Sequence, residues 1–285
     1  MLCTLQEVLQ IALEKNQGLA AFNVYGFEDA YPVVKAAEER QAPVVLMTNK
    51  AAVDYMGVGL LATLLLRIAR NSTTQVCVHL DHGTDVPVIR EAIEEGYTSV
   101  MFDGSQLPFD QNVAITKEVV CMAHARGISV EAEIGAVGFS DPSIEFVARY
   151  SNADEAKLFQ EHTDVDALAV AIGTVHRMEE QGVALRFDLL REISHTVPVP
   201  LVIHGASGVT DGDLVRLIES GARKINLGTV LRIAFGTVLR SQFSQHPKEY
   251  DRIKLFPACM QAVYEKALQK ITLLQAIPDA AASNP

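Results

Sequence analysis

Eight short apolar runs alternate with longer amphipathic stretches along the 285 residues of the chain, and this alternation restricts the fold more than any other feature. The runs are rich in β-branched residues and almost continuously apolar, which is typical of strands buried on both faces of a parallel sheet. The stretches between them carry apolar residues at helical spacing, and several end in the Gly that commonly follows a helix. The runs are GLAAFNVY (18–25), APVVLMTN (42–49), TQVCVHLDH (74–82), YTSVMFDGS (97–105), GISVEAEIG (127–135), VDALAVAIG (165–173), VPLVIHGAS (199–207) and ARKINLGT (222–229).

Strands separated by single helices form βαβ units, and eight such units favour a closed α/β barrel, the (β/α)8 or TIM barrel. An open, doubly wound parallel sheet is the alternative. We expect one domain over residues 1–285, with an extra N-terminal helix and a C-terminal helical extension at about 248–275. The small, polar tail from about residue 277 is expected to be frayed.

Charge and cysteine content exclude several classes of protein. Asp and Glu outnumber Lys and Arg by 35 to 24, which gives a net charge of −11, and no segment collects a basic stripe. Nucleic acid and membrane are therefore not expected as partners. The four cysteines lie far apart and form no C-x-x-C pair, so we interpret them as reduced thiols. Since no signal peptide or apolar span is recognisable either, the sequence predicts a cytoplasmic protein.

Polar or ionisable residues stand where each of the eight runs ends. In a barrel the active site is built from the C-terminal strand ends and the loops that follow them, so these side chains should meet at one mouth. They are Asn23, Thr48, Asp81 with His82, Asp103, Glu133, His176, His204 and Asn226.

Three of the eight histidines, His82, His176 and His204, belong to this set. Three neutral imidazoles with an open fourth position form a catalytic zinc site. Asp81 precedes His82, so its carboxylate is expected nearby for proton transfer, or else as a partner that orients a ligand histidine. Asp103 and Glu133 have the same two interpretations. We interpret His79, His124, His162, His195 and His246 as structural or solvated.

Two glycine-containing segments, HGASG (204–208) and NLGT (226–229), stand at the seventh and eighth loops. In this fold these loops often bind a phosphate through backbone N–H groups. Each segment alone is weak evidence, because glycines also make ordinary turns. Their position beside His204 favours phosphate binding.

Taken in order, the segments FNVY, LDHG, SVMFDGS, VEAEIG, LAVAIGTVH, LVIHGASG and KINLGT resemble the zinc-dependent class II ketose-bisphosphate aldolases, and among them the tagatose-bisphosphate branch. The resemblance covers almost the whole chain. It implies reversible aldol cleavage of a ketose 1,6-bisphosphate, of the tagatose or fructose type, to dihydroxyacetone phosphate and an aldehyde such as glyceraldehyde 3-phosphate. It also implies a homo-oligomer, a dimer or tetramer, and some tagatose-type relatives work with a second, related subunit.

The resemblance assigns a role to each candidate residue. Zinc would be held by His82, His176 and His204, and Asp81 would pass a proton to and from the oxygen on the aldehyde side. Asp103 and Glu133 match carboxylates near the metal, where some relatives bind zinc in an alternative position. A monovalent cation, Na⁺ or K⁺, often helps to bind the phosphate. The substrate-binding and phosphate-binding set implied is Asn23, Thr48, Arg177, Gly205, Ala206, Ser207, Asn226, Leu227, Gly228 and Thr229.

Three departures from the family pattern stand out. Arg177 follows the second zinc histidine, where the family usually has Gly, and either contributes a guanidinium to an anionic group or points into solvent. Phe139 replaces a Gly in the loop that usually carries the proton-abstracting acid, for which Asp141 is favoured by position over Glu145. NLGT stands where the tagatose branch has N-V-A-T and the fructose branch has an acidic residue.

These departures keep alternatives open. One is the same chemistry on another phosphorylated keto-sugar, such as a deoxy-keto-sugar-acid phosphate, or on another anionic aldehyde. A second is a non-catalytic partner subunit that retains the metal site. A third, a metal-dependent hydrolase on the same fold, would need a water-activating base and no phosphate-binding loops.

Overall fold

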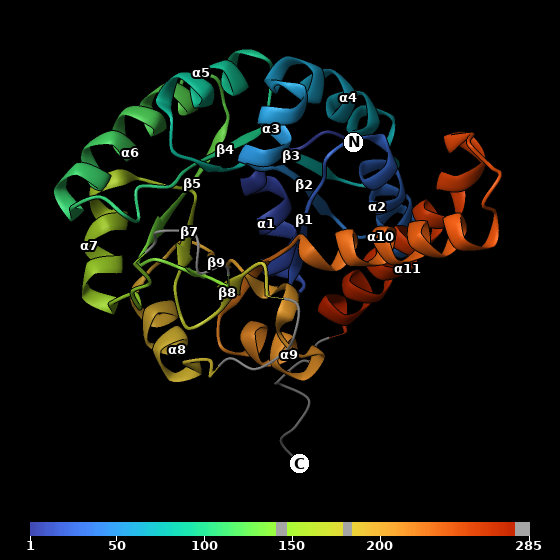
Figure 1. Cartoon of the computed structure of the whole chain (residues 1–285). Coiled ribbons are helices and arrows are strands. Elements are labelled where there is room, and N and C mark those ends of the chain that lie inside the picture. Colours follow the sequence, from blue (N-terminus) through green and yellow to red (C-terminus); the bar gives the residue numbers. More distant parts are fainter. Residues whose placement is uncertain (141–146, 179–183, 277–285) are drawn as a thin grey trace.

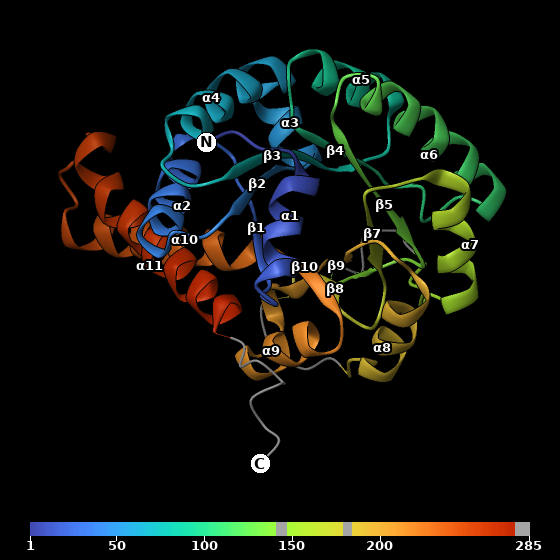
Figure 2. The same ribbon diagram turned by 180° about the vertical axis from the view of Figure 1, so that it is seen from behind.

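The computed structural model describes residues 1–140, 147–178 and 184–276. Eight parallel strands close into a barrel in the order β1-β10-β9-β7-β5-β4-β3-β2 (Figures 1 and 2). Each of the eight apolar runs supplies one strand, which confirms the predicted barrel and excludes the open sheet. The strands are β1 (Leu19–Asn23), β2 (Val44–Thr48), β3 (Val76–Gly83), β4 (Ser99–Phe102), β5 (Ser129–Ile134), β7 (Ala167–Val170), β9 (Leu201–Ile203) and β10 (Ala222–Leu227).

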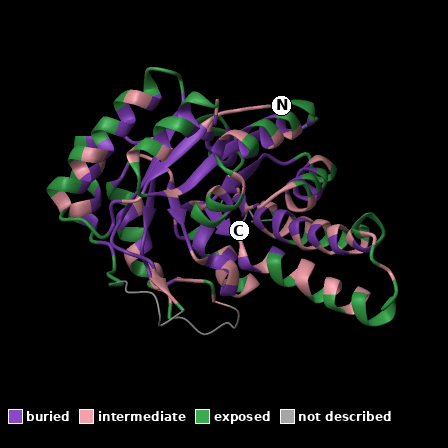
Figure 3. Cartoon of the chain, turned by 45° about the horizontal axis from the view of Figure 1, so that its top comes forward, coloured by how far each residue is buried: buried purple, intermediate pink, exposed green. Residues whose placement is uncertain are grey.

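Helices surround the barrel, as Figure 1 shows. Apolar side chains on their inner faces pack against the outward-facing side chains of the strands and form a continuous core. In Figure 3 the strands and the inner faces of the helices are buried, whereas the outer faces are exposed. These helices are α2 (Phe27–Arg40), α3 (Lys50–Met56), α4 (Val58–Asn71), α5 (Val86–Glu94), α6 (Phe109–His124), α7 (Ala153–Thr163), α8 (Phe187–Thr196) and α9 (Asp211–Glu219).

The predicted N-terminal helix, α1 (Leu5–Glu14), closes the barrel at the N-terminal ends of the strands (Figure 2). Thr4 and Glu7 cap its first turn reciprocally. Its apolar face, which includes Leu5 and Leu9, joins the inward-facing residues of the strands in a second core inside the barrel. Because this end is filled, polar side chains meet at the opposite end.

The C-terminal extension is a pair of helices, α10 (Thr229–Gln245) and α11 (Arg252–Gln275). The pair projects from the barrel on the side of α2 (Figures 1 and 3). The predicted extension at 248–275 corresponds to α11, whereas α10 follows β10 directly and begins in the NLGT segment. The tail that was expected to be frayed lies outside the described residues.

One predicted strand end is placed differently. His176 does not extend β7 but lies in β8 (Val175–His176), which pairs in parallel with β6 (Gly138–Phe139) in a separate two-stranded sheet. A three-residue turn, η1 (Ala206–Gly208), follows β9. Within the described residues, no single helix is long and apolar enough to cross a membrane. The bent pair α3 and α4, with 104° between the two helices, reaches that length and composition only when taken together.

Candidate metal centre

Three imidazoles gather at the end of the barrel opposite α1. His82 lies at the end of β3, His204 directly follows β9, and His176 reaches the same place from the two-stranded sheet. The centroid of the His82 ring lies 4.5 Å from that of His204 and 4.8 Å from that of His176. One nitrogen from each of the three rings lies within 4.8 Å of the other two, so the rings can share a metal ion.

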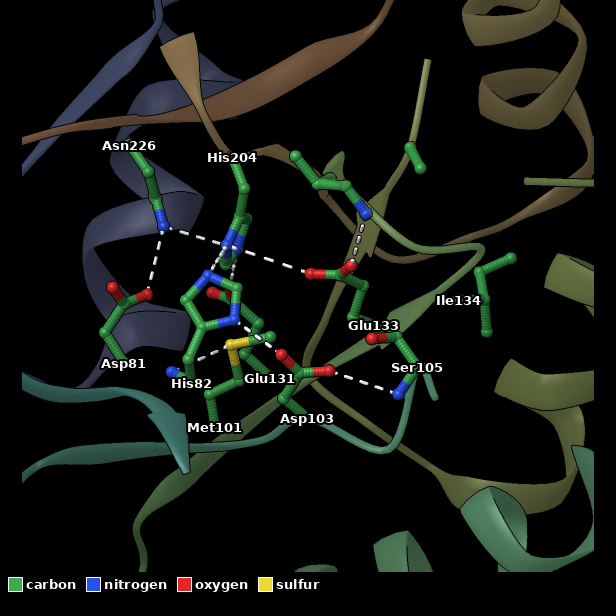
Figure 4. Close-up of polar contacts among 12 residues, drawn as sticks. Asp81, His82, Met101, Asp103, Ser105, Glu131, Glu133, Ile134, His204 and Asn226 are labelled. Carbon is green, nitrogen blue, oxygen red and sulfur yellow. Dashed lines mark hydrogen bonds and ion pairs between the residues drawn. The ribbon is translucent and has the colours of Figure 1, made fainter. Parts of the chain in front are cut away.

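Carboxylates fix which nitrogen two of the three rings present to the centre. Nδ1 of His82 lies 2.6 Å from Oδ2 of Asp103, and Nε2 of His204 lies 2.8 Å from Oε1 of Glu131 (Figure 4). A carboxylate only accepts hydrogen bonds, so each of these nitrogens carries a proton in the neutral ring. The remaining nitrogens, Nε2 of His82 and Nδ1 of His204, therefore present lone pairs to each other.

These two nitrogens are only 2.7 Å apart. Two lone pairs at this distance repel each other, so a cation must lie between them: the proton that His82 carries in the metal-free protein, or a metal ion that takes its place. Imidazoles oriented by carboxylates are the usual arrangement of histidine ligands in protein metal sites. The donor set therefore fits zinc, which prefers three neutral nitrogen ligands with an open position.

The electrostatics of the centre attract positive charge. Burial disfavours the imidazolium of His82, but the carboxylates of Asp81, Asp103 and Glu133 outweigh this and raise its pKa to about 10. Burial lowers the pKa values of His176 and His204 well below the ordinary range, and the positive charge of His82 lowers both further. The three rings therefore bind one positive charge between them, and the other two rings stay neutral.

Asp81 leaves the strand on a different side from its neighbour His82. The backbone of His82 has φ +52°, in the left-handed region that non-glycine residues rarely adopt, and this turn separates the two side chains. Asp81 is buried and accepts hydrogen bonds from Nδ2 of Asn23 at 2.9 Å and Nδ2 of Asn226 at 3.3 Å. Burial raises its pKa, but the positive charges of His82 and Lys224 outweigh this and lower it, so the carboxyl stays ionised.

Asp103 and Glu133 lie on the other side of His82, and the three residues form a second group that could hold a metal ion. Burial, with the charge of Asp103, raises the pKa of Glu133 to about 8. Its Oε1 accepts a hydrogen bond from the backbone N–H of Val137 at 3.1 Å. Oε2 of Glu133 is buried and has no hydrogen-bond partner among the described residues, so it is available to a cation.

A cavity of about 310 Å³ opens onto the three histidines and Asp81. One wall is formed by the loops after β9 and β10, where the backbone N–H of Gly228 donates to Oγ of Ser207 at 3.0 Å. Helix α10 begins at Thr229, so its first free N–H groups lie at this wall. Small side chains and free N–H groups at a helix N-terminus are suited to bind a phosphate.

Arg177 borders the same wall. Gly205, with φ +65°, lies so close to the backbone of Val175 and His176 that a Cβ atom there would meet it at 2.8 Å, and Gly208 packs against the side chain of Met178. The segment 175–178 therefore lies along the loop 205–208, and Arg177 lines the cavity between them. Arg177 has φ +59°, a conformation that glycine adopts without strain.

Most of the predicted site residues come together at this cavity, but Thr48 does not line it. Thr48 is buried, and its Oγ1 lies 2.9 Å from the hydroxyl of Tyr97, so the predicted contact of Thr48 with the substrate stays a prediction. Ala206 and Leu227 are buried in the core and could contribute only backbone groups. Asp141 and Glu145 lie outside the described residues. The predicted residues that line the cavity are Asn23, Asp81, His82, His176, Arg177, His204, Gly205, Ser207, Asn226, Gly228 and Thr229.

Other residues at the site were not predicted from the sequence. Tyr25, Asn49, Lys50 and Arg232 line the cavity from loops and first helical turns, where polar residues are too common to stand out. Glu131 was missed although it left a signal. It stands two positions from Glu133 in an apolar strand, so both carboxylates point to the same face.

Comparison with known proteins identifies the family of the chain. The family model described as class-II fructose-bisphosphate aldolase matches residues 3–277. The chain is 35% identical to the fructose-bisphosphate aldolase of Giardia intestinalis, over 95% of this chain and 92% of that protein. It is also 35% identical to the 6-phospho-5-dehydro-2-deoxy-D-gluconate aldolase of Bacillus licheniformis, over 94% of this chain and 93% of that protein.

Among solved structures, the YdjI aldolase from Escherichia coli K12 superimposes with a TM-score of 0.84 at 32% identity, and the match covers 96% of this chain and 97% of that one. The similarity therefore includes the whole barrel.

Proposed function

Since the chain belongs to the class-II fructose-bisphosphate aldolase family and is therefore an aldolase, a carbon–carbon lyase, we propose that it cleaves a ketose 1,6-bisphosphate reversibly with zinc held by His82, His176 and His204. The substrate is of the tagatose or fructose type, and the products are dihydroxyacetone phosphate and an aldehyde such as glyceraldehyde 3-phosphate. The observation that carries the proposal is the 2.7 Å approach of two imidazole nitrogens, each set by a carboxylate behind its ring.

Zinc bound there supplies a Lewis acid that polarises the ketose carbonyl. The chain's own groups handle the protons. In cleavage, Asp81 accepts the proton of the hydroxyl on the carbon that becomes the aldehyde, and in the reverse direction it returns this proton. It is suited to this role because it is ionised, buried and held by the amides of Asn23 and Asn226. Asp141 is proposed to supply the proton that completes dihydroxyacetone phosphate.

The phosphate of the dihydroxyacetone half is proposed to bind at the loops after β9 and β10. Side chains and N–H groups of Ser207, Gly228 and Thr229 line that wall, and Gly205 allows a close approach. Backbone groups of Ala206 and Leu227 complete the proposed set, with a monovalent cation, Na⁺ or K⁺, beside the phosphate. Asp103 and Glu133 are proposed as an alternative metal position.

A second candidate is a substrate whose aldehyde half carries a carboxylate instead of a phosphate. Lys50, Arg177 and Arg232 bring three cations to the cavity, one of them where the family pattern has Gly. The relative from Bacillus licheniformis is named for a deoxy-keto-sugar-acid phosphate. Cleavage of that compound between C3 and C4 gives dihydroxyacetone phosphate and an aldehyde acid, so the same metal chemistry serves both candidates.

The test offers the zinc-loaded protein tagatose 1,6-bisphosphate, fructose 1,6-bisphosphate and 6-phospho-5-dehydro-2-deoxy-D-gluconate in turn. Release of dihydroxyacetone phosphate identifies an active aldolase, and the ratio of the three kcat/KM values identifies the substrate class. A non-catalytic subunit would release none. It would also fail to exchange a proton of dihydroxyacetone phosphate with deuterated solvent, a reaction that needs no aldehyde.

We further propose a cytoplasmic, single-domain protein that works as a homo-oligomer, a dimer or tetramer, with or without a second tagatose-aldolase-type subunit. The exposure of Ile233 and Phe243 on the projecting helix α10 supports association through that helix. Sedimentation velocity of the wild type and of the variant Ile233→Asp/Phe243→Asp tests this. Dissociation in the double variant is expected, and a monomeric wild type would contradict the proposal.

A further inference from the structure

Behind the three histidines, two opposite charges lie inside the barrel. Glu131 on β5 and Lys224 on β10 have no solvent exposure, and Nζ of Lys224 lies 2.8 Å from Oε2 of Glu131. Strands β5 and β10 are not neighbours, because β9 and β7 stand between them in the barrel. The ion pair therefore crosses the barrel interior. Neither residue lines the cavity that opens onto the histidines.

Burial of this pair is not explained by stability. Removing two charges from water costs several kcal/mol per ion, and well-packed apolar residues of similar volume often stabilise a fold equally well or better. The surrounding barrel interior already contains an apolar core in which such residues would fit. The pair must therefore contribute something that apolar side chains cannot.

The contact made by the second carboxylate oxygen of Glu131 indicates what the ion pair contributes. Oε1 accepts the Nε2–H of His204 at 2.8 Å, which leaves Nδ1 of His204 unprotonated and directed toward Nε2 of His82. In Figure 4 the carboxylate of Glu131 lies next to the His204 ring and behind the ring of His82. Asn226 competes for the same nitrogen, because its Nδ2 lies 3.2 Å from Nε2 of His204. An amide N–H that donated to Nε2 would leave the proton on Nδ1, the nitrogen that faces the metal position.

We propose that Lys224 and Glu131 are positioning residues for the metal centre: Lys224 holds the Glu131 carboxylate in place, and Glu131 fixes the tautomer and ring orientation of His204 against the competing amide of Asn226. The proposal rests on the metal centre proposed above, but not on which substrate is cleaved. It assigns a function to two residues that touch neither substrate nor metal.

The test replaces the pair with apolar residues of similar size, Glu131→Leu/Lys224→Met, and measures Co²⁺ affinity and metal-free thermal stability. Loss of a partner behind a ligand histidine typically weakens metal binding by roughly 10-fold to 100-fold. We expect a loss of that size with no fall in the metal-free melting temperature. A second variant, Glu131→Gln/Lys224→Met, keeps an oxygen that can accept from Nε2 and should bind Co²⁺ with intermediate affinity. Lys270→Met is the control, because it removes another buried lysine, the partner of Asp211.

Wild-type Co²⁺ affinity in the apolar double variant would overturn the proposal. A second measurement needs no variant that could fail to fold. In the metal-free wild type, ¹⁵N-histidine NMR should show the proton of His204 on Nε2, and a proton on Nδ1 would also overturn the proposal. If the wild type itself does not bind Co²⁺, the proposed metal centre fails, which is distinguishable from a double variant that binds as tightly as wild type.

Discussion

The imidazole of His82 is held at 2.6 Å by the carboxylate of Asp103, with its other nitrogen facing His204. Metal binding must displace the proton that this arrangement retains on His82, whose pKa is about 10. Affinity for zinc should therefore rise as the pH rises from 7 to 9, by about tenfold per pH unit for one displaced proton. Calorimetry in buffers of different ionisation enthalpy measures the proton released. Affinity that does not change with pH would show that His82 is not a ligand.

His204→Ala should remove metal retention and cleavage together, because only two imidazoles remain. The measurement is zinc content by mass spectrometry after dialysis, alongside turnover. His195→Ala is the matched control, since His195 is exposed on α8 and its Nδ1–H donates to the backbone oxygen of Arg191 in the same helix. A normal zinc content in His204→Ala would refute the ligand assignment.

Asp81→Asn should keep the metal and lose cleavage. The amide preserves the size of the side chain and one oxygen for Asn23, but it cannot take up the proton. Loss of a general base typically lowers kcat by roughly 10² to 10⁴. Zinc content near one per chain with kcat reduced by this amount is expected. Unchanged turnover would reduce Asp81 to a supporting role.

Glu133 should make metal-free stability depend on pH. Its pKa is about 8 in the folded chain and near the ordinary value of 4.5 when unfolded, so the folded state holds a proton that the unfolded state has lost. Its stabilising contribution is complete below 4.5 and is lost as the pH rises through 8. Glu133→Gln has no such proton to lose. The difference in unfolding free energy between the variant and the wild type, measured by urea denaturation, should therefore grow in favour of the variant between pH 5 and 8. A difference independent of pH would contradict the assignment.

Arg177→Gly should distinguish the effect of Arg177 on backbone strain from its effect on substrate binding. Glycine relieves the left-handed conformation, worth about 1 kcal/mol, so the melting temperature should rise. The lost guanidinium should raise KM for an anionic substrate, roughly tenfold for one charge-assisted hydrogen bond. Arg216→Ala on α9 is the control, since Arg216 is exposed and pairs with Asp213. An unchanged KM with a raised melting temperature would show that Arg177 points into solvent.

The barrel could be predicted from the sequence because apolar runs of strand length leave little choice of fold. The polar residues at their ends were predicted as site residues for the same reason, since Asp81 and His204 stand out at the end of apolar strands. Thr48 was predicted in the same way but does not line the cavity. It also ends a strand, but Tyr97 from the neighbouring part of the barrel accepts or donates its hydrogen bond. A contact between residues 49 positions apart leaves no local pattern.

The ion pair of Lys224 and Glu131 behind the histidines was not predictable in the same way. Lys224 and Glu131 are 93 positions apart, and in the sequence each is a charged residue within a mostly apolar strand. Only closure of the barrel brings them together. His176 lies beside His82 and His204 as expected, but it belongs to a different element than predicted, because the two-stranded sheet that carries it depends on pairing with Gly138 and Phe139.

We propose that the three histidines hold the metal on which carbon–carbon cleavage depends. The most direct test adds zinc in steps to metal-free protein and follows release of dihydroxyacetone phosphate from the best of the three candidate substrates. We predict that the rate rises linearly, reaches a plateau at one zinc per chain and falls to the background rate when a chelator is added. Full turnover by the metal-free protein in excess chelator would contradict it.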